Sequence, residues 1–264
     1  MRVVRFLDPA GQVRSGRLDE DGRAFCFRED EGEELTFEDA PTQVSQFLAP
    51  IAPPNIFAIG RNYRAHAAET GSTAPEQPMI FGKPTTSVIG PDESIVLPAH
   101  GGSVEIDYEA ELAIVIGRLA RRVSIDEALK FVFGYTCAND VSARDYQRND
   151  KQWTRAKGQD TFCPLGPWIV TADELGSPDR LRIQSRLNGQ VMQDARTSDM
   201  VHSCAALISY LSHQFTLLPG TIILTGTPEG VGMARTPPVF LRPGDEIAVE
   251  IEGVGTLTNS VVAG

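Results

Sequence analysis

Residues 105–117, EIDYEAELAIVIG, carry the strongest fold signal in the chain. The first half alternates acids with other residues, and the second half is apolar at every position. In an extended strand, residues two apart face the same side. The alternation therefore predicts one strand over 105–117 that runs into a core and carries four acids on one face: Glu105, Asp107, Glu109 and Glu111.

Four acids on one strand face allow two interpretations. The face can simply be solvated, as in many antiparallel sheets. The same strand, however, continues into residues 113–116, AIVI, which are apolar on both faces and therefore indicate burial. Carboxylates crowded next to a core repel one another and are costly to keep ionised. A hard divalent cation with oxygen ligands would resolve this conflict, so we expect a metal site here.

A second segment supplies a further acid. Residues 134–147, GYTCANDVSARDYQ, are strand-like as far as Asn139 and Asp140 and then become polar. Functional side chains often lie where a regular element gives way to a loop. Asp140 alone would equally suit a turn or a helix N-cap. The acid-rich strand before it is what favours a metal ligand at this position.

Composition limits the class of protein. The chain has 264 residues, 41% hydrophobic and 22% charged, which suits one sizeable core or a main domain with a small appendage. No apolar run approaches the roughly 18 residues of a membrane span, and the N-terminus lacks the apolar region of a signal peptide. We therefore expect a soluble, cytoplasmic protein. The net charge of -11 disfavours nucleic acid as a partner.

Cysteine spacing gives no sign of a disulfide framework or a zinc ribbon. The four cysteines are far apart and form no CxxC pair: Cys26, Cys137, Cys163 and Cys204. Free cysteine usually behaves as a small buried hydrophobic residue. We expect all four to be reduced and structural.

The chain divides into two units. Residues 1–50 hold short strand patterns at 1–7 and 23–28, separated by turns rich in glycine and acids. Residues 48–60, LAPIAPPNIFAIG, then place three prolines before a new apolar run, which is typical of a connector. We predict a small β-rich N-terminal domain over 1–52 and a catalytic domain over 53–264.

Strand patterns outnumber helical patterns after this boundary. One helix is predicted over 124–134, with Ser124 and Glu127 forming a capping box, and an amphipathic helix is predicted over about 200–215. Strand patterns occur at 56–60, 221–226, 247–251 and 253–262. The fold class is therefore α+β with a mainly β core, and not a doubly wound sheet.

Seven segments, in this order, resemble the catalytic domain of the fumarylacetoacetate hydrolase family. They are GRNYRAHAAE, FGKPTTSVIGP, DYEAELAIVIG, GYTCANDVSARDYQ, WTRAKGQDTFCPLGPW, LNGQVMQDARTSDM and ILTGTPEGVG, and they span roughly residues 55–262. Residues 1–50 resemble the variable N-terminal extension of bacterial members. The resemblance implies a mixed β-sheet roll and a homodimer.

The resemblance also implies nine site residues. They are the metal ligands Glu109, Glu111 and Asp140, the catalytic residues His66, Glu69 and Lys157, and the substrate-binding residues Arg144, Gln147 and Thr227. The metal would be Mg²⁺ or Mn²⁺, with Ca²⁺ a further option. His66 and Glu69 are three residues apart, so a helix would place them on one face, where the carboxylate can orient the imidazole. Outside this context, His66 would be taken for a surface histidine.

The implied reaction is metal-dependent hydrolysis of a C–C bond in a small 2,4-diketo acid, of the acylpyruvate or fumarylpyruvate type, through a metal-stabilised enolate. The alternative is a decarboxylase or isomerase of 2-keto dicarboxylic acids in aromatic degradation, acting on oxaloacetate or 2-hydroxyhepta-2,4-diene-1,7-dioate. His66 with Glu69 could activate a water, which favours hydrolysis. A non-catalytic binding module would be expected to have lost one of these residues, and none is lost.

One glycine-rich segment has a simpler interpretation than its composition suggests. Residues 226–232, GTPEGVG, lack the GxGxxG pattern and a following helix pattern. We predict a tight turn near the site and no nucleotide-binding loop.

Overall fold

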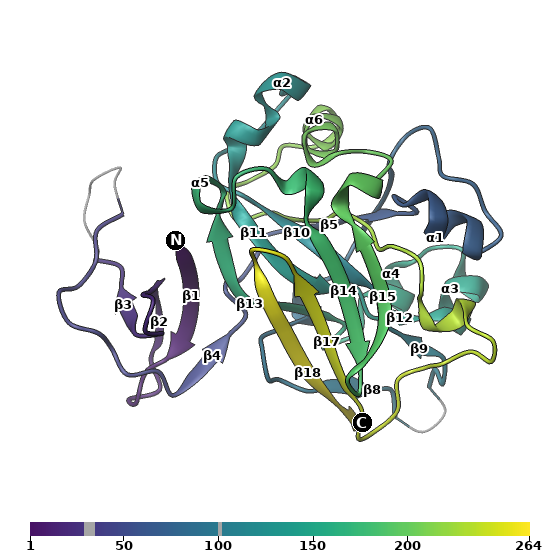
Figure 1. The fold of residues 1–264 in the computed structure, drawn as a ribbon, viewed down its shortest axis with the longest axis horizontal. Helices are drawn as coiled ribbons and strands as arrows, with labels where there is room; N and C mark the ends of the chain where they lie inside the picture. The colour runs from purple at the N-terminus through teal and green to yellow at the C-terminus, as the bar shows by residue number, and fades with distance from the viewer. Residues whose placement is uncertain (29–34, 100–101) are drawn as a thin grey trace.

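The computed structural model describes residues 1–28, 35–99 and 102–264. Strands dominate it, in one large sheet and a second, five-stranded sheet, with short helices at the periphery (Figure 1). Most strand pairs are antiparallel, but β16 and β5, β13 and β7, and β18 and β8 pair in parallel. The predicted α+β, mainly β class with mixed sheets is confirmed.

The large sheet has the strand order β3-β2-β1-β13-β11-β10-β16-β5-β6, with β4 beside β1 and β7 beside β13. Its central strands are β13 (Cys163–Thr171), β11 (Val132–Asn139), β10 (Ala110–Ile116), β16 (Ile222–Leu224) and β5 (Ile56–Gly60). Every residue of β10 is buried, as the apolar run at 113–116 predicted. The outer strands are β6 (Met79–Gly82) and β7 (Val88–Ile89).

The five-stranded sheet has the order β15-β14-β17-β18-β8. Its strands are β14 (Arg182–Leu187), β15 (Gln190–Arg196), β17 (Glu246–Ile251), β18 (Gly255–Ala263) and β8 (Ile95–Leu97). The tight turn between β14 and β15 uses Asn188 and Gly189, both at positive φ, as the twist of such a hairpin requires. The strand patterns did not predict this hairpin or β13.

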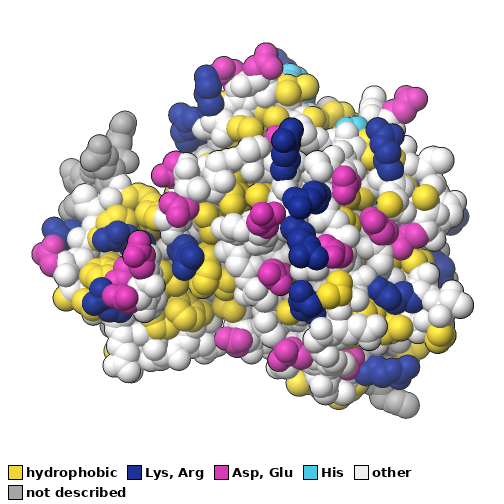
Figure 2. Space-filling model, viewed as in Figure 1, with side chains coloured by type: hydrophobic (Ala, Val, Ile, Leu, Met, Phe, Trp, Pro, Cys, Tyr) yellow, Lys and Arg dark blue, Asp and Glu magenta, His cyan; other side chains and the backbone are white. Residues whose placement is uncertain are grey.

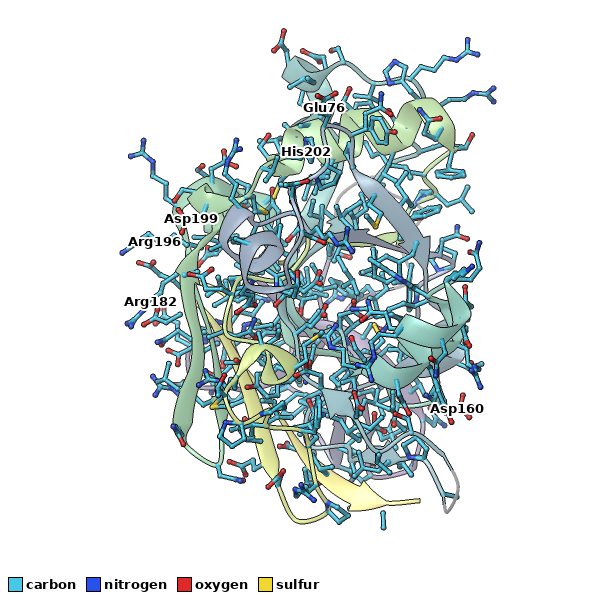
Figure 3. All side chains as sticks on the ribbon, turned by 90° about the vertical axis from the view of Figure 1, so that its right-hand side faces the viewer. Glu76, Asp160, Arg182, Arg196, Asp199 and His202 are labelled. Atoms are coloured by element: carbon cyan, nitrogen blue, oxygen red, sulfur yellow. The ribbon has the colours of Figure 1, made fainter. Side chains whose placement is uncertain are left out.

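The exposed face of this sheet is covered by paired charges. Figure 2 shows basic and acidic side chains interleaved on this side of the molecule. Arg182 lies 2.6 Å from Asp194, and Arg196 lies 3.7 Å from Glu252. Both arginines point outward from the exposed face of this sheet (Figure 3). The face is therefore a solvated surface with local charge compensation, and exposed pairs of this kind contribute little to stability.

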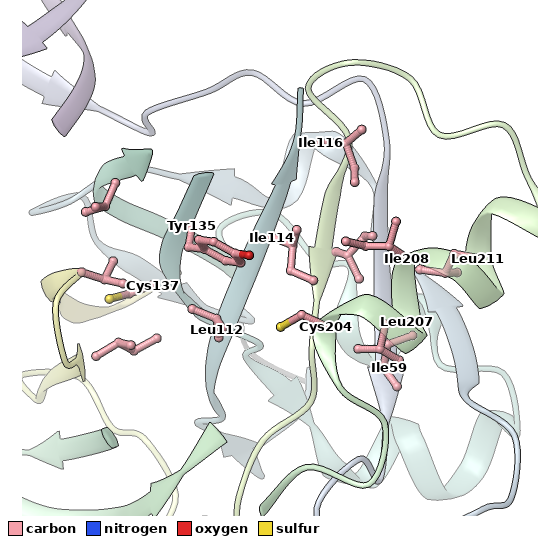
Figure 4. Close-up of a cluster of buried hydrophobic side chains, with 14 of the residues drawn as sticks. Ile59, Leu112, Ile114, Ile116, Tyr135, Cys137, Cys204, Leu207, Ile208 and Leu211 are labelled. Carbon is pink, nitrogen blue, oxygen red and sulfur yellow. The ribbon is translucent and has the colours of Figure 1, made fainter. Parts of the chain in front are cut away.

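An amphipathic helix covers part of one face of the large sheet, and the five-stranded sheet packs against the same core cluster. Leu207, Ile208 and Leu211 of α6 (Cys204–Gln214) pack over side chains of β10 and β5 (Figure 4). The helix begins after Ser203, whose side chain accepts a hydrogen bond from the Ala206 N–H. The predicted start near residue 200 is therefore too early. Val201 and His202 lie in a bend before the helix, where their N–H groups donate to Asn62.

The predicted helix over 124–134 is wrong in its length and its cap. α2 spans only Ile125–Ala128, a 3₁₀ turn follows at Leu129–Phe131, and β11 begins at Val132. Pairing of Val132 with β10 overrides the helical pattern. The Ser124 side chain forms no cap hydrogen bond.

In the described parts of the chain, no helix is long and apolar enough to cross a membrane.

The N-terminal strands extend the large sheet (Figure 1). They are β1 (Arg2–Leu7), β2 (Val13–Leu18), β3 (Ala24–Cys26) and β4 (Gln46–Leu48). The strands predicted at 1–7 and 23–28 are present, and β2 was not predicted. β1 pairs antiparallel with β13, with Arg2 opposite Val170 and Val3 opposite Ile169. The domain boundary at residue 52 stays a prediction.

The predicted strand over 105–117 is two strands. β9 (Ile106–Asp107) pairs with β12 (Ser142–Ala143), whereas β10 pairs with β11 and β16. The break has a local cause. The Asp107 carboxylate accepts a hydrogen bond from the Tyr108 N–H, and the Glu109 N–H donates to the Asn139 side chain instead of a neighbouring strand. The four acids therefore do not share one face.

Short elements complete the chain. The helices are α1 (Arg64–Glu69), α3 (Arg144–Asp150), α4 (Thr154–Lys157) and α5 (Ala172–Leu175), and the remaining 3₁₀ turns are Thr85–Ser87, Pro178–Arg180, Thr197–Asp199 and Gly232–Ala234. All four cysteines are buried and free, as predicted.

Candidate active site

A cavity of about 330 Å³ lies where β5, α1, α3 and α4 meet the start of β10. This volume suits a small molecule. Six of the nine predicted site residues line it: His66, Glu109, Arg144, Gln147, Lys157 and Thr227. A larger hollow of about 790 Å³ lies beside the N-terminal strands, but the ionisable residues in its lining are Arg23 and Asp92. The smaller cavity is therefore the candidate active site.

Three buried carboxylates form a cluster at this site. Glu109 precedes β10, Glu111 lies on β10 and Asp140 follows the end of β11. Pairing of Ala110 with Asn139 brings the two strands together, and the Asp140 N–H donates to the Glu109 carbonyl at 2.9 Å. One oxygen from each carboxylate lies within 4.8 Å of the others. The three predicted ligand residues thus form a group that could hold a divalent metal.

The environments of two of these carboxylates differ. Burial alone would raise the pKa of Glu109, but the charges of Lys157, Arg144 and His66 outweigh it and lower the pKa to about 2. Glu111 accepts one hydrogen bond, from the Gly226 N–H at 2.6 Å. Burial, followed by the charges of its two neighbouring carboxylates, raises the pKa of Glu111 well above its ordinary value. Glu111 is therefore the carboxyl that most needs a cation.

The charge balance of the site also fits a divalent metal. Among the described residues, four buried carboxylates face three buried cations: Asp107, Glu109, Glu111 and Asp140 against Lys83, Arg144 and Lys157. With all four carboxylates ionised, one negative charge would be left without a partner in a region of low dielectric, which is unfavourable. Oxygen donors with excess negative charge are what Mg²⁺, Mn²⁺ and Ca²⁺ bind in proteins.

Two buried lysines contact the carboxylate cluster. The Lys157 ammonium lies 2.7 Å from both Glu109 and Asp140. Burial lowers its pKa, but these carboxylates outweigh burial and raise it, so Lys157 is charged at neutral pH. Lys83 contacts the other oxygen of Asp140 at 2.5 Å and the carbonyl of Lys157. Lys83 was not predicted, although a lysine directly after the apolar stretch MIFG indicates a buried cation that needs a partner.

The predicted His66–Glu69 pair is present on α1. The His66 Nδ1 atom lies 2.8 Å from Glu69 Oε1, and the other carboxylate oxygen accepts the Gly230 N–H at 2.9 Å. The carboxylate is thereby held from both sides. His66 is buried and lines the cavity, and its Nε2 atom has no hydrogen-bond partner in the described part of the chain.

Arg144 and Gln147 lie together on the first turn of α3. Arg144 donates from Nε to Asp107 at 2.8 Å, and from Nη1 to Glu109 at 2.7 Å and to Gln147 at 3.0 Å. Its Nη2 group is buried without a hydrogen-bond partner within the described residues. Because buried donors are nearly always satisfied, this group marks a place for a ligand acceptor.

The turn predicted over 226–232 holds the carboxylates of the site. Three glycine N–H groups each donate to a different acid: Gly226 to Glu111, Gly230 to Glu69 and Gly232 to Asp107. Thr227 lines the cavity, but its hydroxyl donates to the Ala110 carbonyl and accepts from Gln193. It therefore has no hydrogen left to donate to a substrate.

The outer two acids of 105–117 have other partners. Asp107 accepts from Arg144 and from three backbone N–H groups, so it orients the arginine rather than joining the carboxylate cluster. Glu105 pairs with Arg148 at 2.8 Å near the surface. Two of the four acids, Glu109 and Glu111, belong to the cluster.

One small cavity is surrounded by buried carboxylates that could hold a divalent cation, by a histidine–carboxylate pair and by cationic side chains that could bind a small anion. Residues 55–262 match the family model described as fumarylacetoacetate (FAA) hydrolase C-terminal. The chain belongs to the fumarylacetoacetate hydrolase family, as its sequence segments predicted.

Several similar proteins carry isomerase or tautomerase names. Over 224 residues the chain is 46% identical to the mitochondrial oxaloacetate tautomerase Fahd2a of Rattus norvegicus, covering 84% of this chain and 71% of that protein. The solved 5-carboxymethyl-2-hydroxymuconate delta-isomerase of Mycobacterium smegmatis is 44% identical, with a TM-score of 0.87 and full coverage of both chains. The 2-hydroxyhepta-2,4-diene-1,7-dioate isomerase of Mycobacterium marinum is 42% identical, with a TM-score of 0.83 over 100% of this chain and 98% of that one.

Proposed function

We propose that the protein is a metal-dependent tautomerase or isomerase that moves a proton between carbon and oxygen in a small 2-oxo acid. The observation that carries the proposal is the His66–Glu69 pair, which shares one cavity with a buried carboxylate cluster. The names of the similar proteins support proton transfer more than hydrolysis. This ranks the isomerase alternative of the sequence analysis above C–C bond hydrolysis.

The carboxylate cluster prepares the site for a keto acid. Glu109, Glu111 and Asp140 would hold a divalent cation, which when bound would polarise the keto oxygen of the substrate. The Lys157 ammonium adds positive charge to the same wall of the cavity. Developing negative charge on oxygen would therefore be stabilised by groups that are already in place.

Arg144 and Gln147 would orient the substrate. The buried Nη2 group of Arg144 is a free charged donor that can bind a carboxylate. The Gln147 carbonyl already accepts from Arg144, so its NH₂ group remains for the substrate. If Arg144 and Gln147 hold the substrate carboxylate that lies next to the keto group, the substrate cannot rotate freely. The carbon on the other side of the keto group then faces His66 in one orientation.

His66 would act as the acid–base group. Because Nδ1 is engaged by Glu69, the proton moves through Nε2 on the cavity side of the ring. In the direction from enol to keto form, Nε2 takes the proton from the enol oxygen and then gives it to the adjacent carbon, so that the ring returns to its starting state. In the reverse direction Nε2 removes the proton from the carbon beside the keto group.

The test follows the enol-to-keto conversion of oxaloacetate by ultraviolet absorbance, with Mg²⁺ or Mn²⁺ and then with chelator. We expect chelator-sensitive acceleration and a fall in kcat of about 10²–10⁴-fold in His66→Ala. His202→Ala is the matched control, because His202 contacts the Pro75 carbonyl and does not line the cavity. Equal activity of His66→Ala and wild type would refute the proposed role.

Hydrolysis remains a second candidate because the same histidine pair could activate a water molecule. Acylpyruvate and fumarylpyruvate are the substrates that separate the two functions. Release of pyruvate from either one, lost with chelator and in His66→Ala, would favour the hydrolase. Release of CO₂ from oxaloacetate under the same conditions would indicate decarboxylation.

A further inference from the structure

We propose that Arg61 binds a second carboxylate of the substrate, so that the enzyme selects 2-oxo dicarboxylic acids over monocarboxylic ones. The inference rests on the proposed function and names its substrate class. Arg61 follows β5 directly and lines the cavity together with Arg144 and Lys157. It was not among the site residues predicted from the sequence.

The other cationic side chains of the cavity are already paired with carboxylates. Arg144 and Lys157 bind acids of the buried cluster. Arg148 contacts both oxygens of Glu105, at 2.8 and 2.9 Å. Arg61 forms no ion pair or hydrogen bond through its side chain with any residue in the ranges that the structure describes. It is therefore a guanidinium with its full donor set available to a ligand carboxylate.

The backbone at Arg61 is in an unusual conformation. Its φ of 57° lies in the left-handed region, which residues other than glycine, asparagine and aspartate seldom adopt. Glycine would make this turn without strain, yet the position carries a long cationic side chain. A strained position that places a charged group in a cavity is typical of a functional site.

Neighbouring residues hold this turn in place. The Asn62 side chain donates to the carbonyls of Thr225 and His202, at 2.7 and 3.0 Å, and accepts the His202 N–H at 2.9 Å. On the other side, a Cβ at Gly60 would lie 2.6 Å from the Trp153 ring, so the strand end and the ring are in close contact. Arg61 is thus fixed between two anchored residues.

The cavity has two anion-binding groups and an apolar wall. The buried Nη2 of Arg144 can take one carboxylate, and the guanidinium of Arg61 can take another. Ile59, Phe81 and Trp153 supply apolar lining, which suits the carbon chain of a short diacid. A monocarboxylic substrate would leave Arg61 without a partner.

The experiment compares Arg61→Met and Arg61→Asn with Arg61→Lys and the control Arg64→Met. Asparagine accepts the left-handed backbone, so it removes the charge without adding strain. Arg64 is an exposed residue of α1 outside the cavity lining. Substrates are oxaloacetate and its 4-methyl ester, which lacks the distal charge and is larger by one methyl group. We expect KM for oxaloacetate to rise about 10- to 100-fold in both neutral variants, with kcat and the KM of the ester nearly unchanged. Arg61→Lys should recover part of the loss.

A binding measurement separates this inference from the proposed reaction. Calorimetry of the Mn²⁺-loaded protein with L-malate and its 4-methyl ester needs no turnover. If wild type prefers malate and Arg61→Asn loses that preference, Arg61 binds the second carboxylate even where oxaloacetate is not turned over. Equal losses for malate and ester, no loss in either neutral variant, or the same loss in Arg64→Met would each overturn the assignment.

Discussion

At the level of single residues, Glu111 would make the proposed metal binding depend on pH. The raised pKa means that the metal-free folded chain keeps a proton on Glu111 at a pH where the unfolded chain has lost it. The stability of the metal-free protein therefore falls as pH rises from the unfolded pKa through the folded one. A divalent metal requires the ionised carboxylate, so metal binding must release this proton.

We predict that Mn²⁺ binding releases protons and weakens as pH falls through the raised pKa of Glu111. Calorimetry in two buffers with different protonation enthalpies measures the protons released. Glu111→Gln should abolish this release and lower the affinity by about 100-fold or more. Glu105→Gln is the control, because Glu105 pairs with Arg148 outside the cluster. Proton release that persists in Glu111→Gln would place the titrating group elsewhere.

Site residues could be predicted from the sequence where they lie close to one another along the chain. They were missed where their role depends on distant residues or on an unusual backbone conformation. Glu109 and Glu111 are two residues apart, a spacing that brings side chains together in a strand. His66 and Glu69 are three residues apart, a spacing that brings side chains together in a helix. Lys83 and Arg61 were missed for different reasons. The apolar stretch before Lys83 indicates a buried cation, but its partner Asp140 is 57 positions away and has no sequence pattern to identify it. Arg61 depends on a positive φ, which leaves no pattern in the sequence.

At the level of elements, the loop at 226–232 connects the stability of the fold to the proposed metal site through Gly226. This residue has a φ of 96°, and a Cβ there would lie 2.7 Å from the Asn62 Cβ. We predict that Gly226→Ala destabilises the protein by about 2–4 kcal/mol, through backbone strain and overpacking together. It should also weaken Mn²⁺ binding, because its N–H holds Glu111.

Gly189→Ala provides the matched control for this prediction. Gly189 also has positive φ, but a Cβ there meets no atom within 4 Å. It should lose about 1–2 kcal/mol from backbone strain alone and keep its metal affinity. Urea unfolding of the chelator-treated variants measures the stabilities. Equal losses in the two variants would show that contact with Asn62 adds nothing.

The same scale shows why some elements were predicted and others not. The apolar runs at 56–60, 113–116 and 221–226 form buried strands. A strand that is apolar on both faces is stable only inside a sheet that is covered on both sides, so these strands could be predicted from the sequence. The break at residues 108–109 arises from hydrogen bonds of Asp107 and Asn139 to the backbone. Side chains that bond the backbone in place of a neighbouring strand leave no periodic pattern in the sequence. The alternation of residues therefore predicted one continuous strand.

At the level of the whole molecule, the family resemblance implies a homodimer, which we keep as a prediction. Light scattering coupled to size exclusion should give about twice the mass of one chain, which is 28.7 kDa. The experiment should be run with Mn²⁺ and with chelator, because a metal can stabilise an assembly that the free chain does not form. A mass of one chain under both conditions would contradict the prediction.

The N-terminal strands offer the last prediction, because they decide what residues 1–52 contribute. β1 covers one edge of β13, and Val3 packs in the same core cluster as Ile169 and Ala49. Removing residues 1–52 would leave a long central strand with an open edge beside exposed apolar side chains, and such edges promote aggregation. We therefore expect the chain 53–264 to aggregate or to melt well below the full chain in a thermal unfolding experiment.

Point variants in the N-terminal strands distinguish the loss of core packing by Val3 from the loss of the whole segment 1–52. Val3→Glu would bury an unpaired charge and should cost about 3–5 kcal/mol, whereas Val13→Glu, at a site that is 52% exposed, should change stability little. If 53–264 instead remains soluble with unchanged melting, the boundary at residue 52 separates units that fold independently. In that case the pairing of β1 with β13 would be a docking contact between domains, and its strength could be measured by adding residues 1–52 back as a separate peptide.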